Sequence, residues 1–252
     1  MTELTIIVPT RSRPASPARV VEAWEATGAF EQGAQLLFVV DGDDPEYLAY
    51  CDALGALARG NALGRVGWTS VVAWEPLVPK LNTAALCEAT DSPGLFAIGF
   101  AGDDHLPRTR GWVRRYLEIL REVGTGIVYC DDGYQHENIP TQWAMTADIV
   151  RVLGKMVPAD VEHLYCDNAV RDLGLGAGCL HYLPDVLIEH MHPVARDAAG
   201  SPKGADDPQY RRVNSREQSR GDRAAYRGWH RSGGYAHDVE IVRNLIEQGV
   251  QA

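Results

Sequence analysis

The sequence has no run of 18 or more apolar residues, the length that a helix needs to cross a bilayer. Residues 1–9 also lack the basic region that opens a secretory signal peptide. The five cysteines are scattered and include no Cys-x-x-Cys pair, which argues against a zinc cluster or a disulfide framework. We therefore expect a cytoplasmic protein with reduced thiols and no membrane span.

Several signatures of nucleotide and metal chemistry are missing as well. There is no Walker A sequence and no His-Glu-x-x-His pair. Gly174, Gly176 and Gly178 have the wrong spacing for the dinucleotide-binding fingerprint, and they follow a predicted helix instead of a strand. A nucleotide site in this chain must therefore be built from other residues.

Negative charge predominates, but it is unevenly distributed. The formal net charge is −10, which argues against a surface coated with nucleic-acid contacts. Residues 196–231 nevertheless contain nine Lys or Arg against five Asp or Glu. This basic segment has two interpretations: a solvated, partly mobile tail, or a surface for an anionic acceptor or for phosphates.

Short apolar runs alternate with helical patterns through the first 130 residues. We predict strands at residues 4–8, 36–40, 66–74, 95–100 and 127–130. Helices are predicted between them at residues 16–27, 45–58, 79–89 and 109–122. Apolar strands that alternate with helices are typical of a buried, mostly parallel sheet, whose ligands bind beyond the carboxyl ends of the strands.

The alternation loosens after residue 130. Helical patterns occur at residues 146–154 and 161–173, and residues 179–188 read as extended. Residues 194–234 are rich in Gly, Pro, Ser, Asp and Arg without clear periodicity, which predicts a long loop or lid of a composition compatible with disorder. An amphipathic helix is predicted at residues 236–249.

Polar side chains follow the first two predicted strands. Pro9, Thr10, Arg11 and Arg13 form a turn that suits a phosphate-bearing ligand, because guanidinium groups bind phosphate through paired hydrogen bonds. An ordinary polar loop is the alternative. Asp41 follows the second strand directly, where a carboxylate can accept hydrogen bonds from a base or ribose.

An acidic pair, Asp103 and Asp104, follows the strand predicted at residues 95–100 and precedes a histidine. Two adjacent buried acids repel each other, and Mg²⁺ or Mn²⁺ with a bound diphosphate would remove that cost. His190 and His192 end a late apolar strand on the same side of it, where their imidazoles would complete a metal site begun by Asp103. The alternatives are a solvated turn for the acids and structural roles for the histidines.

Asp167 lies on the helix predicted at residues 161–173. Its carboxylate is a candidate general base that would deprotonate an acceptor hydroxyl. Solvation at the surface is the alternative.

The order of these segments resembles the family 2 glycosyltransferases of the GT-A fold. Residues 5–11, Thr-Ile-Ile-Val-Pro-Thr-Arg, look like the opening strand and nucleotide-contacting loop of that family. Residues 38–42, Phe-Val-Val-Asp-Gly, are similar to its second strand, whose Asp meets the base. Residues 81–85, Leu-Asn-Thr-Ala-Ala, lie where the family carries a basic residue or Asn, so the resemblance implies ribose or diphosphate contacts for Lys80 and Asn82.

Three later segments extend the resemblance to about residues 3–193. Residues 101–104, Ala-Gly-Asp-Asp, look like the family's Asp-x-Asp-Asp motif, with Ala101 in place of the first Asp and Asp103 as the metal ligand. Residues 165–168 are similar to the region of the catalytic base, with Cys166 in place of the usual Glu and Asp167 retained. Residues 189–192 resemble the segment that carries a metal-binding His in some members.

The resemblance implies an α/β fold with a GT-A-type open, mostly parallel sheet flanked by helices. Residues 1–105 would form a Rossmann-like nucleotide-binding half, residues 106–193 an acceptor half, and residues 194–252 a basic loop or lid with a C-terminal helix. Asp167 would be the catalytic residue. The implied metal ligands are Asp103, His190 and His192. The implied nucleotide-sugar contacts are Pro9, Thr10, Arg11, Arg13, Asp41, Lys80, Asn82, Asp103 and Asp104.

The implied activity is transfer of a sugar from a nucleotide-diphosphate sugar, with UDP-sugars favoured, to an acceptor hydroxyl. It would use Mn²⁺ or Mg²⁺ and invert the anomeric centre, with retention as the alternative. The acceptor stays open, and a nucleic acid such as a hydroxymethylated DNA base is among the candidates. The alternatives are a non-catalytic nucleotide-sugar-binding protein and a sugar-phosphate nucleotidyltransferase.

Overall fold

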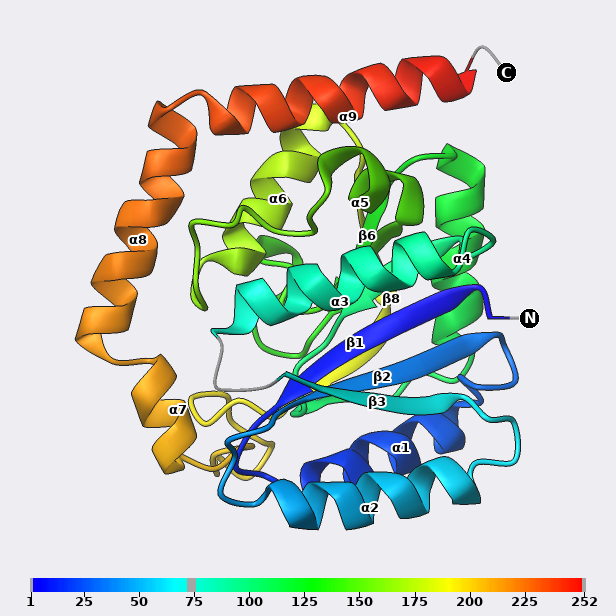
Figure 1. Ribbon diagram of the computed structural model, residues 1–252, viewed down its shortest axis with the longest axis vertical. Helices are drawn as coiled ribbons and strands as arrows, with labels where there is room; N and C mark the ends of the chain where they lie inside the picture. Colours follow the sequence, from blue (N-terminus) through cyan, green and yellow to red (C-terminus); the bar gives the residue numbers. More distant parts are fainter. Residues whose placement is uncertain (1, 72–75, 251–252) are drawn as a thin grey trace.

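A computed structural model describes residues 2–71 and 76–250 and has one sheet of eight strands at its centre (Figure 1). The strand order is β3-β2-β1-β4-β7-β6-β8-β5. The strands are β1 (Leu4–Thr10), β2 (Ala34–Asp41), β3 (Val66–Val71), β4 (Ala97–Phe100), β5 (His105–Pro107), β6 (Ile127–Asp131), β7 (Trp143–Thr146) and β8 (Leu180–His190). Six of these strands run in one direction, and β5 and β7 run in the other. The predicted open, mostly parallel sheet is therefore confirmed.

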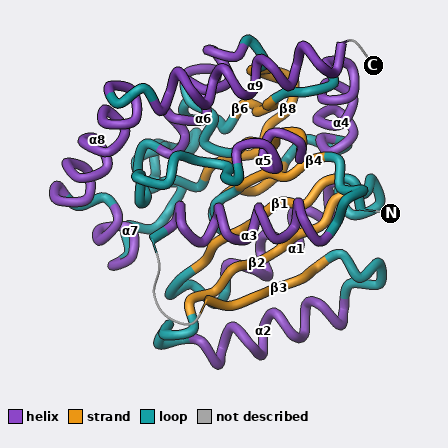
Figure 2. Tube along the Cα trace, turned by 45° about the horizontal axis from the view of Figure 1, so that its top comes forward, coloured by secondary structure: helices purple, strands orange, loops and turns teal. Residues whose placement is uncertain are grey.

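Helices cover both faces of the sheet (Figure 2). One face packs against α1 (Ser16–Thr27), α2 (Tyr47–Gly60) and α4 (Trp112–Val123). The other packs against α3 (Leu77–Asp91), α5 (Ala147–Leu153), α6 (Cys166–Ala177) and α9 (Gly234–Val250). The remaining helices are the 3₁₀ turn η1 (His136–Asn138), α7 (Pro208–Val213) and α8 (Arg216–Arg231).

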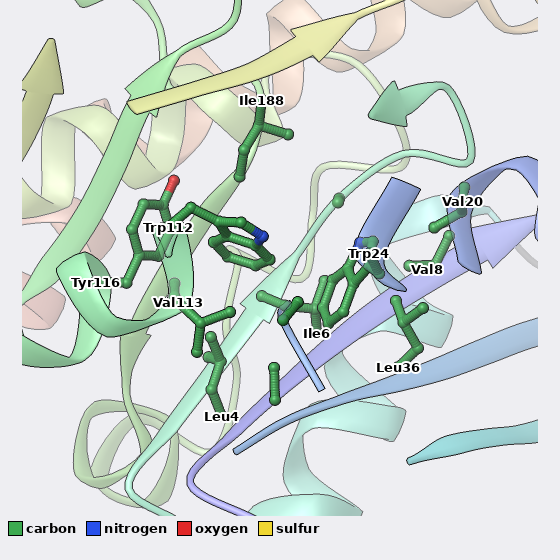
Figure 3. Close-up of a cluster of buried hydrophobic side chains, with 14 of the residues drawn as sticks. Leu4, Ile6, Val8, Val20, Trp24, Leu36, Trp112, Val113, Tyr116 and Ile188 are labelled. Carbon is green, nitrogen blue, oxygen red and sulfur yellow. The ribbon is translucent and has the colours of Figure 1, made fainter. Parts of the chain in front are cut away.

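Each face of the sheet has its own hydrophobic core, and β1 contributes to both. Leu4, Ile6 and Val8 point into the first core with Trp24 and Trp112 (Figure 3). The indole rings of the two tryptophans meet edge to face at 5.1 Å and join α1 to α4. Of the two intervening residues of β1, Ile7 belongs to the second core, and Thr5 is buried and donates a hydrogen bond to Glu88. Because β1 is buried on both faces, its sequence is mostly apolar and does not alternate regularly between polar and apolar residues.

The predicted elements of the first 130 residues all appear, with small shifts in their ends. Residues 72–74 of the strand predicted at 66–74 lie outside the described residues. The short strands β5 and β7 were not predicted, and the helix expected over residues 161–173 begins only at Cys166. None of the described helices has the length and apolar character needed to span a membrane.

The long loop expected over residues 194–234 is wrong for much of that segment. Residues 208–213 and 216–231 form α7 and α8, and α8 runs along one edge of the molecule from α7 to α9 (Figure 1). Only Asp222 and Trp229 of α8 are buried. Because a buried acid occupies one of these two positions, the helix carries no apolar repeat that the sequence could reveal.

Candidate functional site

A cavity of about 280 Å³ opens beyond the carboxyl ends of β1 and β4. It gathers residues from the two ends of the sequence, since Pro9 and Asn214 both line it. The predicted site residues that line it are Pro9, Thr10, Arg11, Arg13, Lys80, Asp103, Asp104, Asp167, His190 and His192. Asp41 and Asn82 are the predicted residues that do not line it.

The turn after β1 is fixed by hydrogen bonds to its backbone. Ser12 has a φ of 57°, in the left-handed region that residues other than glycine seldom adopt. Its amide donates to Asp44 Oδ2 at 2.7 Å, and the amide of Arg13 donates to the buried Tyr50 Oη at 2.9 Å. These contacts hold Arg11 and Arg13 on the cavity wall in a conformation that the turn alone would not favour.

Asp41 is fully buried beneath the cavity and is paired with two cations. Lys80 Nζ lies 2.6 Å from Asp41 Oδ1, and Arg11 Nη1 lies 2.9 Å from Oδ2. Both carboxylate oxygens are thus engaged, and Arg11 also reaches Asp43 at 2.7 Å. A buried carboxylate is costly without such partners, so Asp41 organises the two cations that face the cavity.

Asp103 is also buried, and it is held by Thr10 and Arg13. Thr10 Oγ1 donates to Asp103 Oδ2 at 2.6 Å, and Arg13 Nη1 donates to Oδ1 at 2.9 Å. Burial raises the pKa of Asp103 to about 6, although the charge of Arg13 opposes that shift. The same guanidinium makes a two-bond contact with Asp207, at 2.7 and 3.1 Å. Arg13 therefore links the turn after β1 to the C-terminal segment.

Asp104, His105 and His190 form the one group among the described residues that could hold a metal ion. One ligand atom of each residue lies within 4.8 Å of the other two. Asp104 Oδ1 is 3.2 Å from His105 Nδ1, and Oδ2 is 3.5 Å from His190 Nε2. Antiparallel pairing of β5 with β8 sets His105 opposite His190, and their rings stack with centroids 4.1 Å apart.

The electrostatics of this group are set by its own members and by Asp132. Burial acts to raise the pKa of Asp104, but the two histidines outweigh it and hold that pKa well below its usual value. Burial likewise acts to lower the pKa of His190, yet Asp104 and Asp132 raise it to about 9. Burial and the nearby charge of His190 lower the pKa of His105. The carboxylate is thus flanked by two imidazoles whose pKa values are shifted in opposite directions.

Gly102 leaves room for this group. A Cβ atom at Gly102 would lie 2.5 Å from Asp104 Oδ1 and 2.9 Å from His105 Nδ1. The amide of Gly102 also donates to His105 Nδ1 at 3.0 Å, which orients the ring. Glycine at this position is therefore a requirement of the close approach of the two side chains.

The expected metal ligands are only partly brought together. His190 belongs to the group above, whereas Asp103 is engaged by Arg13 and Thr10. His192 lines the cavity beside the group, where it stacks on Tyr134 with ring centroids 5.1 Å apart.

Asp167 lies in the first turn of α6 and lines the cavity. Its Oδ1 accepts a hydrogen bond from the amide of Asn168 at 2.8 Å, and burial raises its pKa. The segment before it, residues 162–164, is held by Asp222 of α8, which is 1% exposed. Asp222 accepts from the amides of Glu162 at 2.8 Å and Leu164 at 2.7 Å.

Asn82 serves the fold instead of the cavity wall. Its Oδ1 accepts from the amides of Met156 and Val157, both at 2.9 Å, and its Nδ2 donates to the Val157 carbonyl at 2.8 Å. These bonds tie α3 to the segment after α5. Asn82, which lies where the family carries a basic residue or Asn, therefore has a structural role in this protein.

Several residues of the site were not predicted from the sequence as members of it. His105 was noted only as a neighbour of the acidic pair, and Asp132 follows β6 in the position that the strand-end rule would have indicated. Asp132 accepts from three backbone amides and from Thr141, and its carbonyl accepts from the amide of His190. Asp207 and Tyr210 lie in the basic segment, where no pattern in the sequence connects them to the strand ends.

No family model matches this sequence. No curated protein matches it either.

Solved structures do match it. The mannosyltransferase PcManGT from Pyrobaculum calidifontis, in complex with GDP-Man and Mn²⁺, aligns with a TM-score of 0.59 at 14% identity, over 96% of this chain and 86% of that chain. Residues 1–349 of TarS from S. aureus align with a TM-score of 0.55 at 9% identity, over 75% of this chain and 60% of that one. The same TarS segment in complex with UDP aligns with a TM-score of 0.55 at 10% identity. The alignment thus spans less than two thirds of the TarS segment. At these identities the likeness concerns the fold, and the chain has the GT-A-like fold of the glycosyltransferases, as the resemblance in its sequence implied.

Proposed function

We propose that this protein is a metal-dependent glycosyltransferase that uses a nucleotide-diphosphate sugar. The observation that carries the proposal is the cavity beyond the strand ends, where Arg11, Arg13 and Lys80 meet the group of Asp104, His105 and His190. Cationic side chains beside a carboxylate and two imidazoles suit a diphosphate held together with a divalent ion. Within this proposal, residues 1–105 bind the donor and residues 106–193 face the acceptor.

The side chains present fit a divalent ion. His105 Nδ1 and His190 Nε2 face the two carboxylate oxygens of Asp104, at 3.2 and 3.5 Å, so one oxygen-donor and two nitrogen-donor side chains meet at one point. One carboxylate and two imidazoles form a mixed oxygen and nitrogen donor set, which favours Mn²⁺ over Mg²⁺, because Mg²⁺ prefers oxygen ligands alone. A bound divalent cation would offset the negative charge that develops on the departing nucleoside diphosphate. The PcManGT complex contains Mn²⁺ and GDP-Man, and the TarS complex contains UDP, which supports a diphosphate donor without selecting the base.

Asp167 is proposed to act as the general base. Burial raises its pKa, which brings a carboxylate closer to the value at which it accepts a proton effectively near neutral pH. Its carboxylate would take the proton of the acceptor hydroxyl while that oxygen bonds to the anomeric carbon. The bond from that carbon to the diphosphate oxygen breaks on the opposite face, so this single displacement inverts the anomeric configuration.

Binding and turnover test the proposal in sequence. Thermal unfolding is measured with UDP, GDP or dTDP, each with and without Mn²⁺, and the matching nucleotide-sugars are then assayed for hydrolysis and transfer. We expect one diphosphate to raise the unfolding temperature only when Mn²⁺ is present, and the corresponding sugar nucleotide to turn over. Binding without turnover of any donor would favour a non-catalytic nucleotide-sugar-binding protein. The absence of any Mn²⁺-dependent shift would refute metal dependence.

A further inference from the structure

Five arginines form a stripe along α8. They are Arg216, Arg220, Arg223, Arg227 and Arg231, spaced three or four residues apart. At 3.6 residues per turn this spacing keeps all five within an arc of about 80° on one side of the helix. The buried residues Asp222 and Trp229 lie on roughly the opposite side, so the helix presents its arginine stripe away from the protein.

The stripe is exposed and largely without compensating charge. All five arginines are exposed. In the described part of the chain, no carboxylate forms an ion pair with any of them. Residues 208–231 contain seven arginines and two acidic residues in a protein whose net charge is −10. A cationic stripe on an otherwise acidic molecule is suited to an anionic partner.

One arginine of the stripe contacts the cavity wall. Arg223 Nε donates to Tyr165 Oη at 2.9 Å, and Tyr165 lines the cavity. The helix that precedes the stripe, α7, contributes Tyr210 and Val213 to the same wall. A chain that lies along α8 would therefore run toward the mouth of the cavity.

We propose that this arginine stripe binds the phosphodiester backbone of a nucleic acid and leads it to the cavity as the sugar acceptor. The acceptor role rests on the proposed function, whereas the binding itself does not. The stripe is about 22 Å long, at 1.5 Å per residue, and so matches about six phosphates of one strand at 3.4 Å per nucleotide. Arginine suits this partner because its planar fork binds phosphate through paired hydrogen bonds.

A lipid surface fits the stripe less well. The large hydrophobic side chains that are exposed in the described structure do not lie on α8. A helix that binds in a membrane interface needs an apolar face to enter it. The apolar residue Trp229 is instead buried against the protein.

The test measures binding of fluorescent 20-nucleotide DNA, single-stranded and duplex, by anisotropy over a range of salt concentrations. The variant is Arg220→Gln/Arg227→Gln/Arg231→Gln. The matched control removes three exposed arginines elsewhere, as Arg59→Gln/Arg110→Gln/Arg114→Gln. We expect the stripe variant to bind at least about tenfold more weakly, with a salt dependence reduced by about three in the slope of log K against log salt. The control should bind like the wild type.

Each result decides the inference. Absence of DNA binding by the wild type, equal losses in the two triple variants, or binding to poly-glutamate or to phosphatidylserine vesicles as tightly as to DNA would overturn it. Hydrolysis of the nucleotide-sugar is measured on the same preparations and should be equal in all three proteins. Hydrolysis without DNA binding removes this inference and leaves the proposed function standing. DNA binding without turnover of any donor removes the proposed function and the acceptor role with it, and leaves the binding of nucleic acid by the stripe standing.

Discussion

Three carboxylates dominate the site at the scale of single residues, the buried Asp41 and Asp103 and the half-buried Asp104, and each has its own basic partners. Asp41 is held by Arg11 and Lys80, Asp103 by Arg13, and Asp104 by two histidines. Removing one partner of a buried pair leaves an uncompensated charge that costs roughly 3–5 kcal/mol. Replacing these cations would therefore lower stability together with ligand binding, so catalysis is better tested at a residue outside the pairs.

Asp167 is such a residue, and Asp167→Asn is expected to separate chemistry from binding. The amide cannot take the proton of an acceptor hydroxyl, so kcat for transfer should fall by about 10²- to 10⁴-fold. Binding of the nucleoside diphosphate with Mn²⁺, measured by thermal shift, should stay unchanged. Asp160→Asn, an exposed change on the preceding loop, is the control. Unaltered turnover in Asp167→Asn would show that another group accepts the proton.

His163 gives the stability of the protein a defined dependence on pH. Burial lowers its pKa from 6.5 to about 4 in the folded state, so the unfolded chain binds the extra proton between these values. Above pH 6.5 the burial of His163 therefore has no effect on the free energy of unfolding that depends on pH. As the pH falls toward 4, the free energy of unfolding decreases by up to about 3 kcal/mol. Urea unfolding at pH 7.5 and pH 5 should show a smaller acid-induced loss for His163→Gln than for the wild type. Equal losses in the two proteins would mean that His163 protonates freely when folded.

Elements differ in how much of them the sequence reveals. The helix at residues 16–27 is predicted to the residue, because its buried positions are apolar or small and recur with helical spacing. Strand β5 has three residues and exists only through its pairing with β8, so no local pattern marks it. Helix α8 buries Asp222, which accepts hydrogen bonds from the amides of residues 162–164. These partners are far from Asp222 in the sequence, so the sequence alone does not reveal its role.

The sequence likewise reveals some features of the candidate site and not others. The rule that ligands bind after strand ends brings Arg13, Asp103 and His190 to one cavity from three strands. The sequence around Asp103 and Asp104 does not show which of the two acids faces the histidines. In the structure Asp103 pairs with Arg13, whereas Asp104 lies beside His105 and His190. That choice depends on the pairing of β5 with β8, which the sequence does not show.

Asp222 of α8 is expected to position the loop that precedes Asp167. Asp222→Asn replaces an acceptor oxygen by an NH₂ group that faces the amides of residues 162–164, which should cost about 1–3 kcal/mol in the free energy of unfolding. The kcat for transfer should fall by a larger factor than the KM for the donor rises, because the loop leads into the first turn of α6, which carries the proposed base. Glu217→Gln, an exposed acid of the same helix, serves as the control. An unchanged kcat in a destabilised Asp222→Asn would restrict this residue to a structural role.

At the scale of the whole molecule, α7, α8 and α9 form an arm that is attached at both ends. At the far end α9 buries Val239 and Val242 in the second core. At the near end the loop before α7 is held by an ion pair between Lys203 and Glu189 at 2.8 Å, and α7 begins at Asp207, which binds Arg13. Between these anchors half of the residues of α8 are exposed, and the buried Asp222 and Trp229 attach the helix to the rest of the protein. The part of the cavity wall that α7 provides should therefore depend on its contact with Arg13.

Asp207→Ala is expected to release α7 from the cavity without unfolding the protein. The carboxylate makes both bonds to Arg13 and also accepts from the Tyr210 amide as the N-cap of α7, a contact worth about 1 kcal/mol. A local loss of this size should raise the rate of limited trypsin cleavage after Arg211 and Arg212 about fivefold, because about five times more of the protein would have this segment open. Asp206→Ala, which removes only an exposed pair with Arg211, should be cleaved at about the wild-type rate. If the two variants are cut equally fast while their free energies of unfolding are unchanged, then Asp207 does not hold the arm, and α7 stays on the cavity through its other contacts alone.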